Sequence, residues 1–517
     1  MSRPGMSTES VVFHRSEKKY SSASSQGAPM HIALIGDFSG RASRDVNQQD
    51  LAKRKAIEID RDNFEEVFEA LGVSLKLPVS DEPIRFSEFD DLHPDTLYDK
   101  VDLFGKFRVL KNKLKKPELF DAAVEEIQQW STFKGEMEKA SADENTDDGQ
   151  DNTPAEGIAL PADMLGAVLA QSEAQKAYEN SPEGTIERLI KDVISPYVEA
   201  KSDPRLPEML SAVDEATADL LRRIMHSSQF QTLEASWRSV YMLVRRLETN
   251  SKLKLFLIDV SREEIHQDVA QCAGDLQSSD IYKLLVEKNN VAGGTPYALL
   301  NADFILQDSL EDAAFAGAFA ALAECIGASA VLGGHTKIGG CLSLGECDTD
   351  FIDPDDWSYS PSGEFLEGWQ QLCSHETAKH VSIVSPGVML RLPYGEKTSP
   401  IDSFDFEELP NDNTHAFYCW GNGAYIVTLL IAQARSANGA AFKPGQVIEV
   451  EDLPFHAFTV AGESFIKPCA EALLTDRAAA EFAERGLCVL RSVKNKASVI
   501  VPNITSLNGE ALEGVWS

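Results

Sequence analysis

An acidic segment, residues 138–156, divides this chain into two unequal parts. It reads EKASADENTDDGQDNTPAE, with seven acidic residues against one basic residue and no large apolar residue. Such a composition cannot bury a core, so we expect a solvated linker between two folded parts. The predicted organisation is therefore an N-terminal arm at 1–29, a small domain at 30–135, the linker at 136–160 and a large domain at 161–517. The arm is either flexible or adds a strand to another subunit's sheet.

The composition argues against several classes of function. The chain has 517 residues, 43% of them hydrophobic, which is enough for two or three domains with cores. Its 48 basic and 82 acidic residues give a net charge of −34, which disfavours nucleic acids and anionic membrane surfaces as partners. We find no apolar run of the roughly 20 residues that span a bilayer. We therefore expect a cytoplasmic protein without membrane insertion, whose eight cysteines are buried small apolar residues or free thiols.

Short apolar segments predict an α/β fold for the small domain. Residues 31–35 predict a buried strand, and the glycine-containing turn that follows at 36–40 does not have dinucleotide-binding spacing. A second strand is expected at 56–59. Asp62 and Asn63 are suited to cap a helix over 64–71.

The large domain alternates predicted helices and strands. Strands are expected at 253–260, 297–305 and 328–332. The segment 310–326 is so rich in Ala, Phe and Gly that it predicts a helix packed on several sides, ended by Gly327. This alternation favours a mixed α/β fold, with a mixed or largely parallel sheet covered on both faces.

The stretch 224–260 contains the clearest amphipathic helix. Its apolar residues recur at steps of three and four, and we expect them to form one buried stripe. The stripe consists of Phe230, Leu233, Trp237, Val240, Tyr241, Val244 and Leu247.

Residues with chemically useful side chains do not form a recognisable catalytic pattern. The segment 333–340, GGHTKIGG, follows a strand but lacks P-loop spacing, so we expect a flexible loop. His375 and His380 match no zinc spacing and are expected at the surface. The residues His415, Tyr418, Cys419 and His456 have no carboxylate partner that the sequence reveals. We predict no enzyme activity, cofactor or metal, and an enzyme using the 333–340 loop remains a remote alternative.

Four ordered blocks resemble the large subunit of the contractile sheath of bacterial type VI secretion systems. They are QFQTLEASWR at 229–238, GTPYALLNAD at 294–303, RLPYGEKT at 391–398 followed by FDFEE and WGN, and EALLTDR at 471–477. The resemblance marks Phe230, Leu233, Glu234, Trp237, Arg238, Pro393, Tyr394 and Gly395 as family signature and packing residues.

The small domain resembles the small sheath subunit. The similar segments are GDFSG at 36–40, IDRDNF at 59–64 and FSEFDDLHP at 86–94. The chain thus looks like a fusion of small and large subunits, which fixes their ratio and makes their pairing intramolecular. The family's large subunit continues beyond the point at which this sequence stops, so we expect a C-terminally shortened form.

The resemblance implies a structural role. Sheath protomers assemble around an inner tube and contract to propel it, with a baseplate and a recycling AAA+ ATPase as further partners. The family's ATPase grips a helix near the start of the large subunit, where Met164, Leu165, Val168 and Leu169 form an apolar stripe. The shortened C-terminus leaves open a sheath-like accessory protein that caps or anchors the sheath.

Overall fold

The computed structural model describes most of the two predicted domains. The described residues are 29–127 and 206–517, apart from 45, 47–50, 78–81, 117–118, 273, 290–293, 346–350, 410–413 and 461. The predicted N-terminal arm, the acidic linker and the apolar stripe at 164–169 all lie outside these residues. The domain boundaries therefore stay a prediction.

One seven-stranded sheet organises the fold, in the order β14-β8-β7-β6-β1-β5-β2. All neighbouring strands in it are parallel except β2, which runs antiparallel to β5. The strands are β1 (Met30–Gly36), β2 (Ile57–Ile59), β5 (Leu253–Asp259), β6 (Tyr297–Leu306), β7 (Ser329–Gly334), β8 (Val381–Ser385) and β14 (Leu487–Val489). The mixed α/β class predicted from the sequence is confirmed.

Strand β1 belongs to the first segment of the chain but lies inside the sheet of the second. It pairs with β5 along its whole length, from Met30 opposite Leu253 to Gly36 opposite Asp259. On its other side it pairs with β6. The two segments therefore share one sheet, which their separate sequence patterns did not indicate.

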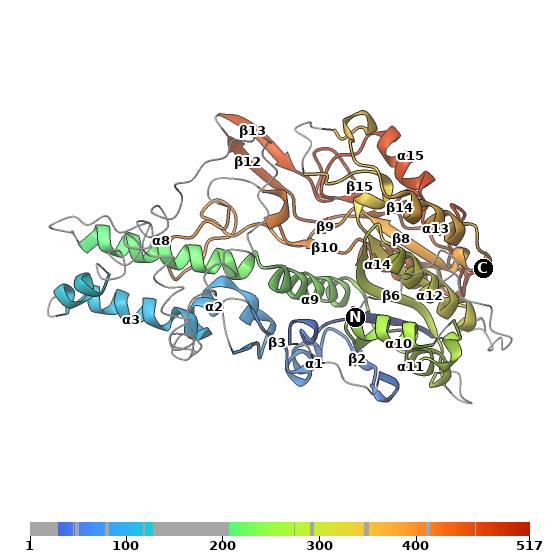
Figure 1. The fold of residues 1–517 in the computed structure, drawn as a ribbon, viewed down its shortest axis with the longest axis horizontal. Helices are drawn as coiled ribbons and strands as arrows, with labels where there is room; N and C mark the ends of the chain where they lie inside the picture. Colours follow the sequence, from blue (N-terminus) through green and yellow to red (C-terminus); the bar gives the residue numbers. More distant parts are fainter. Residues whose placement is uncertain are drawn as a thin grey trace, which may run out of the picture.

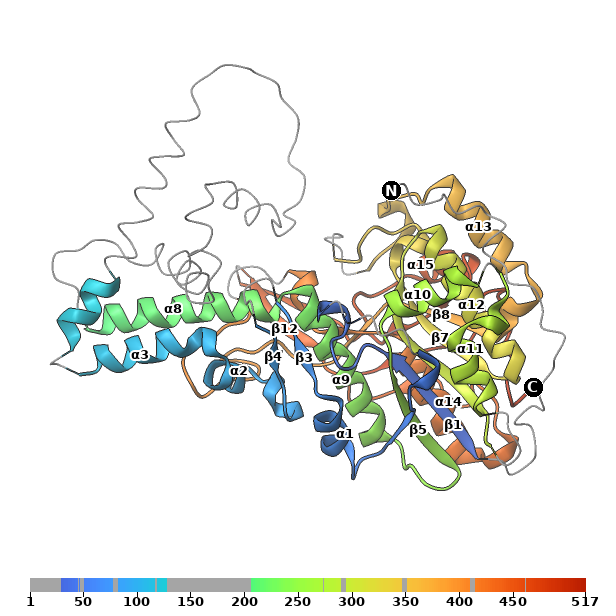
Figure 2. The ribbon, with the colours of Figure 1, turned by 60° about the horizontal axis from the view of Figure 1, so that its bottom comes forward.

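Helices cover both faces of the sheet. Successive side chains of a strand point to opposite faces, so alternate residues of β1 enter two different cores. Ile32 and Leu34 of β1 join the core formed with α9 and α14, whereas Ala33 and Ile35 join the core formed with α10 and α12. Figures 1 and 2 show these helices around the sheet. The helices are α1 (Phe64–Leu71), α9 (Ser228–Arg246), α10 (Arg262–Gln271), α11 (Asp280–Tyr282), α12 (Leu310–Ile326), α13 (Gly363–Cys373), α14 (Ala424–Asn438) and α15 (Asp476–Glu484).

The ends of α12 show how local capping residues set the bounds of a helix. The Ser309 side chain accepts a hydrogen bond from the Asp312 N–H, and Gly327 takes a left-handed conformation with φ of 64°. A non-glycine residue adopts that conformation at a cost. The predicted bounds of 310–326 are confirmed.

A helical extension leaves the sheet on one side. It consists of α2 (Pro94–Lys100) and α3 (Gly105–Leu114) from the first segment and α8 (Leu206–Met225) from the second. Figure 2 shows α3 and α8 side by side, and Lys111 pairs with Asp214 at 2.6 Å. The segments therefore contact each other both in the sheet and in this extension.

Small antiparallel sheets complete the fold. They pair β3 (Ser74–Leu75) with β4 (Ile84–Arg85), β9 (Val388–Met389) with β10 (Trp420–Gly421), β16 (Val499–Ile500) with β11 (Glu449–Val450) and β15 (Arg491–Ser492), and β12 (His456–Val460) with β13 (Glu463–Lys467).

Two local predictions were wrong. Tyr241 is 39% exposed, because the buried stripe of α9 is narrower than the apolar spacing indicated. Residues 333–340 are not a flexible loop. Gly333 and Gly334 end the buried strand β7, and residues 336–339 form a turn of 3-10 helix in which Ile338 is buried.

Candidate functional site

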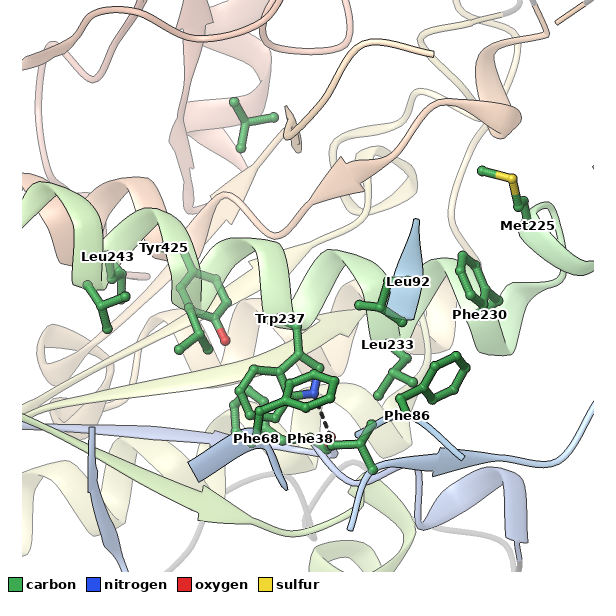
Figure 3. Packing of buried hydrophobic residues seen from close by; sticks show 14 of the residues in the cluster. Phe38, Phe68, Phe86, Leu92, Met225, Phe230, Leu233, Trp237, Leu243 and Tyr425 are labelled. Carbon is green, nitrogen blue, oxygen red and sulfur yellow. Dashed lines mark hydrogen bonds between the residues drawn. The ribbon is translucent and has the colours of Figure 1, made fainter. Parts of the chain in front are cut away.

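The seam between the two segments of the chain gathers most of the predicted signature residues. Trp237 of α9 is fully buried at its centre. Its ring lies edge-on to Phe38 and Phe64, at centroid distances of 5.9 and 5.6 Å, and tilted against Phe68 at 4.5 Å. Figure 3 shows Trp237 with Phe38 and Phe68, and the indole Nε1 donates a hydrogen bond to the Phe38 carbonyl oxygen at 2.8 Å. The helix of one segment is thus fixed to the turn after β1 of the other.

A buried carboxylate holds two arginines across the seam. Glu264 of α10 accepts hydrogen bonds from Arg41 at 3.0 and 3.0 Å and is also paired with Arg54, so both partners come from the first segment. Burial alone raises the pKa of Glu264, but the hydrogen bonds from Arg54 and Arg41 outweigh it and bring the pKa to about 2. The carboxylate is therefore charged at neutral pH.

A second charged cluster connects α9 to the segment that follows β9. Arg391 binds Glu234 at 2.7 and 3.1 Å and Glu408 at 2.7 and 2.9 Å. Glu234 also accepts a 2.7 Å hydrogen bond from Arg238. Burial raises the pKa of Glu234, but the charges of Arg391 and Arg238 dominate and lower it to about 2. Buried charges of this kind are stable only when they are fully paired.

The RLPYG block packs on this cluster. Tyr394 is 4% exposed, accepts a hydrogen bond from Arg238 at 3.1 Å and lies under the Arg391 guanidinium. Its ring also meets His93 of the first segment edge-on at 5.0 Å. A Cβ at Gly395 would approach Glu407 Oε2 to 2.2 Å, which explains why a side chain does not fit there.

The structure thus places the eight predicted signature residues in one region. Phe230, Leu233, Glu234, Trp237, Pro393, Tyr394 and Gly395 are buried, and Arg238 is half-buried. Their meaning as a family signature stays a prediction. The predicted ATPase-binding residues Met164, Leu165, Val168 and Leu169 lie outside the described residues.

The histidines form pairs that the sequence did not reveal. His415 Nε2 lies 3.1 Å from Glu471 Oε2, and Tyr418 contacts His456 Nδ1 at 2.8 Å. His415 therefore has a carboxylate partner that the sequence did not reveal. Glu471 is 56 positions away, and only the tertiary fold brings it close.

The structure also answers the remaining sequence-based questions about histidine positions, metal sites and membrane spans. His380 is 9% exposed and contacts the Ala328 carbonyl oxygen, so its predicted surface position was wrong. Among the described residues, we find no group of three or more His, Cys, Asp or Glu residues arranged to hold a metal ion. No helix in the described part of the chain is long and apolar enough to cross a bilayer.

The seam joins the two segments into one packed structural unit. Comparison with known protein families shows which family this unit belongs to. Residues 207–508 match the family "EvpB/VC_A0108, tail sheath N-terminal domain". Residues 16–145 match "Type VI secretion system, VipA, VC_A0107 or Hcp2". Since the first match covers more than half of the chain, the protein belongs to the type VI secretion system sheath protein family.

One curated relative supports the assignment. Over 296 residues the chain is 29% identical to the type VI secretion system sheath protein TssC1 of Pseudomonas aeruginosa. The aligned region is 56% of this chain and 59% of TssC1, so the chain spans less than two thirds of that relative. The predicted fusion of small-subunit and large-subunit sheath domains is confirmed, as is membership of a structural rather than an enzymatic family.

Proposed function

We propose that this protein is a structural subunit of a type VI secretion system contractile sheath. Copies assemble helically around an inner tube in the bacterial cytoplasm, and shortening of the assembly propels the tube. The observation that carries the proposal is the position of β1, because the small-subunit part supplies an inner strand to the sheet that the large-subunit part builds. Each chain therefore carries a small-subunit part paired with a large-subunit part.

The covalent fusion has a physical consequence for assembly. Two separate subunits pair at a rate and extent set by their concentrations, whereas joined segments pair at a fixed ratio and a high effective concentration. The buried contacts of Trp237 with Phe38 and of Glu264 with Arg41 then form within one molecule. The unit that enters the sheath is the single chain.

The proposed partners are other sheath protomers, the inner tube protein, the baseplate and a recycling AAA+ ATPase. The ATPase contact is assigned to the apolar stripe Met164, Leu165, Val168 and Leu169, on the strength of its position in the sequence. The stripe follows the acidic linker in the sequence, and an apolar helix face of this kind is what a partner's hydrophobic groove recognises.

Electron microscopy of the full-length chain, expressed with the inner tube protein, tests the proposal. We expect long hollow cylinders whose wall contains one copy of this chain per subunit. Short plugs or rings at the ends of sheaths made from other subunits would assign the accessory capping or anchoring role instead. Particles that stay small with every partner would contradict both roles.

A further inference from the structure

The hairpin formed by β12 and β13 is weakly supported within the chain. Its strands pair only with each other among the described residues, and Figure 1 shows it at the upper edge of the molecule. An isolated two-stranded hairpin is marginally stable in water and gains stability when another surface packs on it. Two large apolar side chains of β13 are nevertheless exposed, Phe465 at 41% and Ile466 at 50%.

These side chains line a groove of about 390 Å³ between the hairpin and the turn at 493–496. Phe455, which is 38% exposed, lies on the same groove, and Phe351, 40% exposed, is covered by the Lys494 ammonium at 4.7 Å. Four of the eleven exposed large hydrophobic residues of the described chain therefore lie at or beside this groove. Apolar side chains that gather in this way mark interaction surfaces.

The charge of the groove is opposite to that of the chain. Lys467, Lys494 and Lys496 line it, against Glu471 as the acidic lining residue. The Glu471 carboxylate already has partners: it accepts a hydrogen bond from the Gly387 N–H at 2.5 Å and contacts His415 Nε2. Lys467 contacts His415 Nδ1 at 3.3 Å and the Tyr418 ring, and the charge of Glu471 acts on its ammonium group.

We propose that this groove, the hairpin groove, binds an acidic, apolar segment of a second copy of this chain. Copies that each carry a net charge of −34 repel one another, so their association needs local sites of positive charge. A lysine-rimmed apolar groove supplies one, with the apolar floor burying side chains and the ammonium groups meeting carboxylates. The inference rests on the proposed assembly of copies into a sheath.

A photo-crosslinking residue at Ile466 of the full-length protein tests the inference directly. We expect a covalent dimer of this chain upon irradiation, with the cross-linked peptide coming from an acidic segment. The matched control carries the same residue at Val109, which is 53% exposed and lies on α3, far from the hairpin groove. No dimer above that control, or a cross-link to a different protein, would overturn the inference.

Charge reversal separates this inference from the proposed function. Lys494→Glu with Lys496→Glu should weaken association of copies about tenfold, which corresponds to about 1.4 kcal/mol. The exposed pair Lys76→Glu with Lys443→Glu changes the net charge equally outside the groove and should leave association near that of the unmodified chain. Ile466→Ser serves as a second groove variant, and circular dichroism establishes that each variant is folded.

The possible outcomes are distinct. If the unmodified chain forms sheaths and the groove variants form them equally well, the inference fails and the sheath proposal stands. If the unmodified chain never associates with another copy, both fail.

Discussion

The indole Nε1 of Trp237 donates a hydrogen bond to the carbonyl oxygen of Phe38, which lies 199 positions earlier in the chain. This contact joins the large-subunit part to the turn that follows β1 of the small-subunit part. It forms where four aromatic rings meet, with Trp237 and Phe38 fully buried. The seam between the two sheath-type segments is therefore a hydrophobic core as well as an interface.

Replacing Trp237 should destabilise the whole protein. We expect Trp237→Ala to lower the free energy of unfolding by about 3–5 kcal/mol, because it leaves a cavity among Phe38, Phe64 and Phe68. Trp237→Phe should cost about 1–3 kcal/mol, since the buried Phe38 carbonyl loses its donor. Denaturant unfolding measures both changes. Val109→Ala, at a position 53% exposed, should stay within about 0.5 kcal/mol, and an equal loss there would contradict the account.

The Glu234 cluster predicts a dependence of stability on pH. Glu234→Gln should cost about 3–5 kcal/mol at pH 7, because Arg238 loses its carboxylate and Arg391 keeps only that of Glu408. The pKa of Glu234 is lowered from 4.5 to about 2, so its contribution is complete above pH 4.5 and is lost as the pH falls toward 2. The difference in unfolding free energy between the variant and the unmodified protein should therefore shrink over that range.

Urea unfolding at several pH values between 7 and 3 measures this difference. His226 also destabilises the fold in acid, because burial, Arg391 and Arg222 lower its pKa to about 4. It is present in both proteins, so the comparison removes most of its effect. A difference that stays constant down to pH 3 would show that the Glu234 carboxylate is not held charged by its arginines.

Cutting the linker should not separate the two segments. If a protease site is placed within 136–160 and cleaved, we expect both fragments to elute together from a sizing column. The reason is that β1 pairs with β5 on one side and β6 on the other, and its removal would open two inner strand edges. Fragments that elute separately without denaturant would contradict this.

The contribution of the pairing of Glu264 with Arg41 and Arg54 can be measured in the cleaved protein, as the urea concentration at which its two fragments dissociate. Glu264→Ala removes the ion pairs that this carboxylate forms with Arg41 and Arg54 across the seam, and leaves Arg41 with only its longer contact to Asp259. We expect the cleaved variant to dissociate at a lower urea concentration than the cleaved parent. Glu263→Ala, at the preceding exposed position on α10, is the matched control and should not change that concentration.

The ATPase contact is predicted from the sequence alone. Leu165→Asp with Leu169→Asp should abolish capture by the recycling ATPase, because charged side chains do not enter an apolar groove. A pull-down with the ATPase measures capture. Ala167→Asp with Ala170→Asp adds the same charge on the opposite face of the predicted helix and should retain binding. Undiminished capture of the stripe variant would remove these residues from the site.

The local sequence by itself determined where several of the helices and five strands of the main sheet form. The bounds of α12 follow from its capping residues, and those of α1 from apolar periodicity. The predicted cap of α1 was wrong, because the Asn63 side chain bonds Asp60 and Glu58 and makes no capping hydrogen bond. The strands β1, β5 and β6 follow from short apolar runs. These signals act between residues close in the chain. The family resemblance added the fusion of two sheath subunits, which composition and periodicity do not contain.

Only the tertiary structure decided how the segments combine. The insertion of β1 between β5 and β6, the pairing of Glu264 with Arg41 and the contact of His415 with Glu471 all join residues distant in sequence. A buried strand carries apolar side chains on both faces whatever its neighbours are, so its sequence does not name its partners. Tyr241 fits the apolar spacing of α9 but lies at the edge of the core, because the packed neighbours set the width of the buried face.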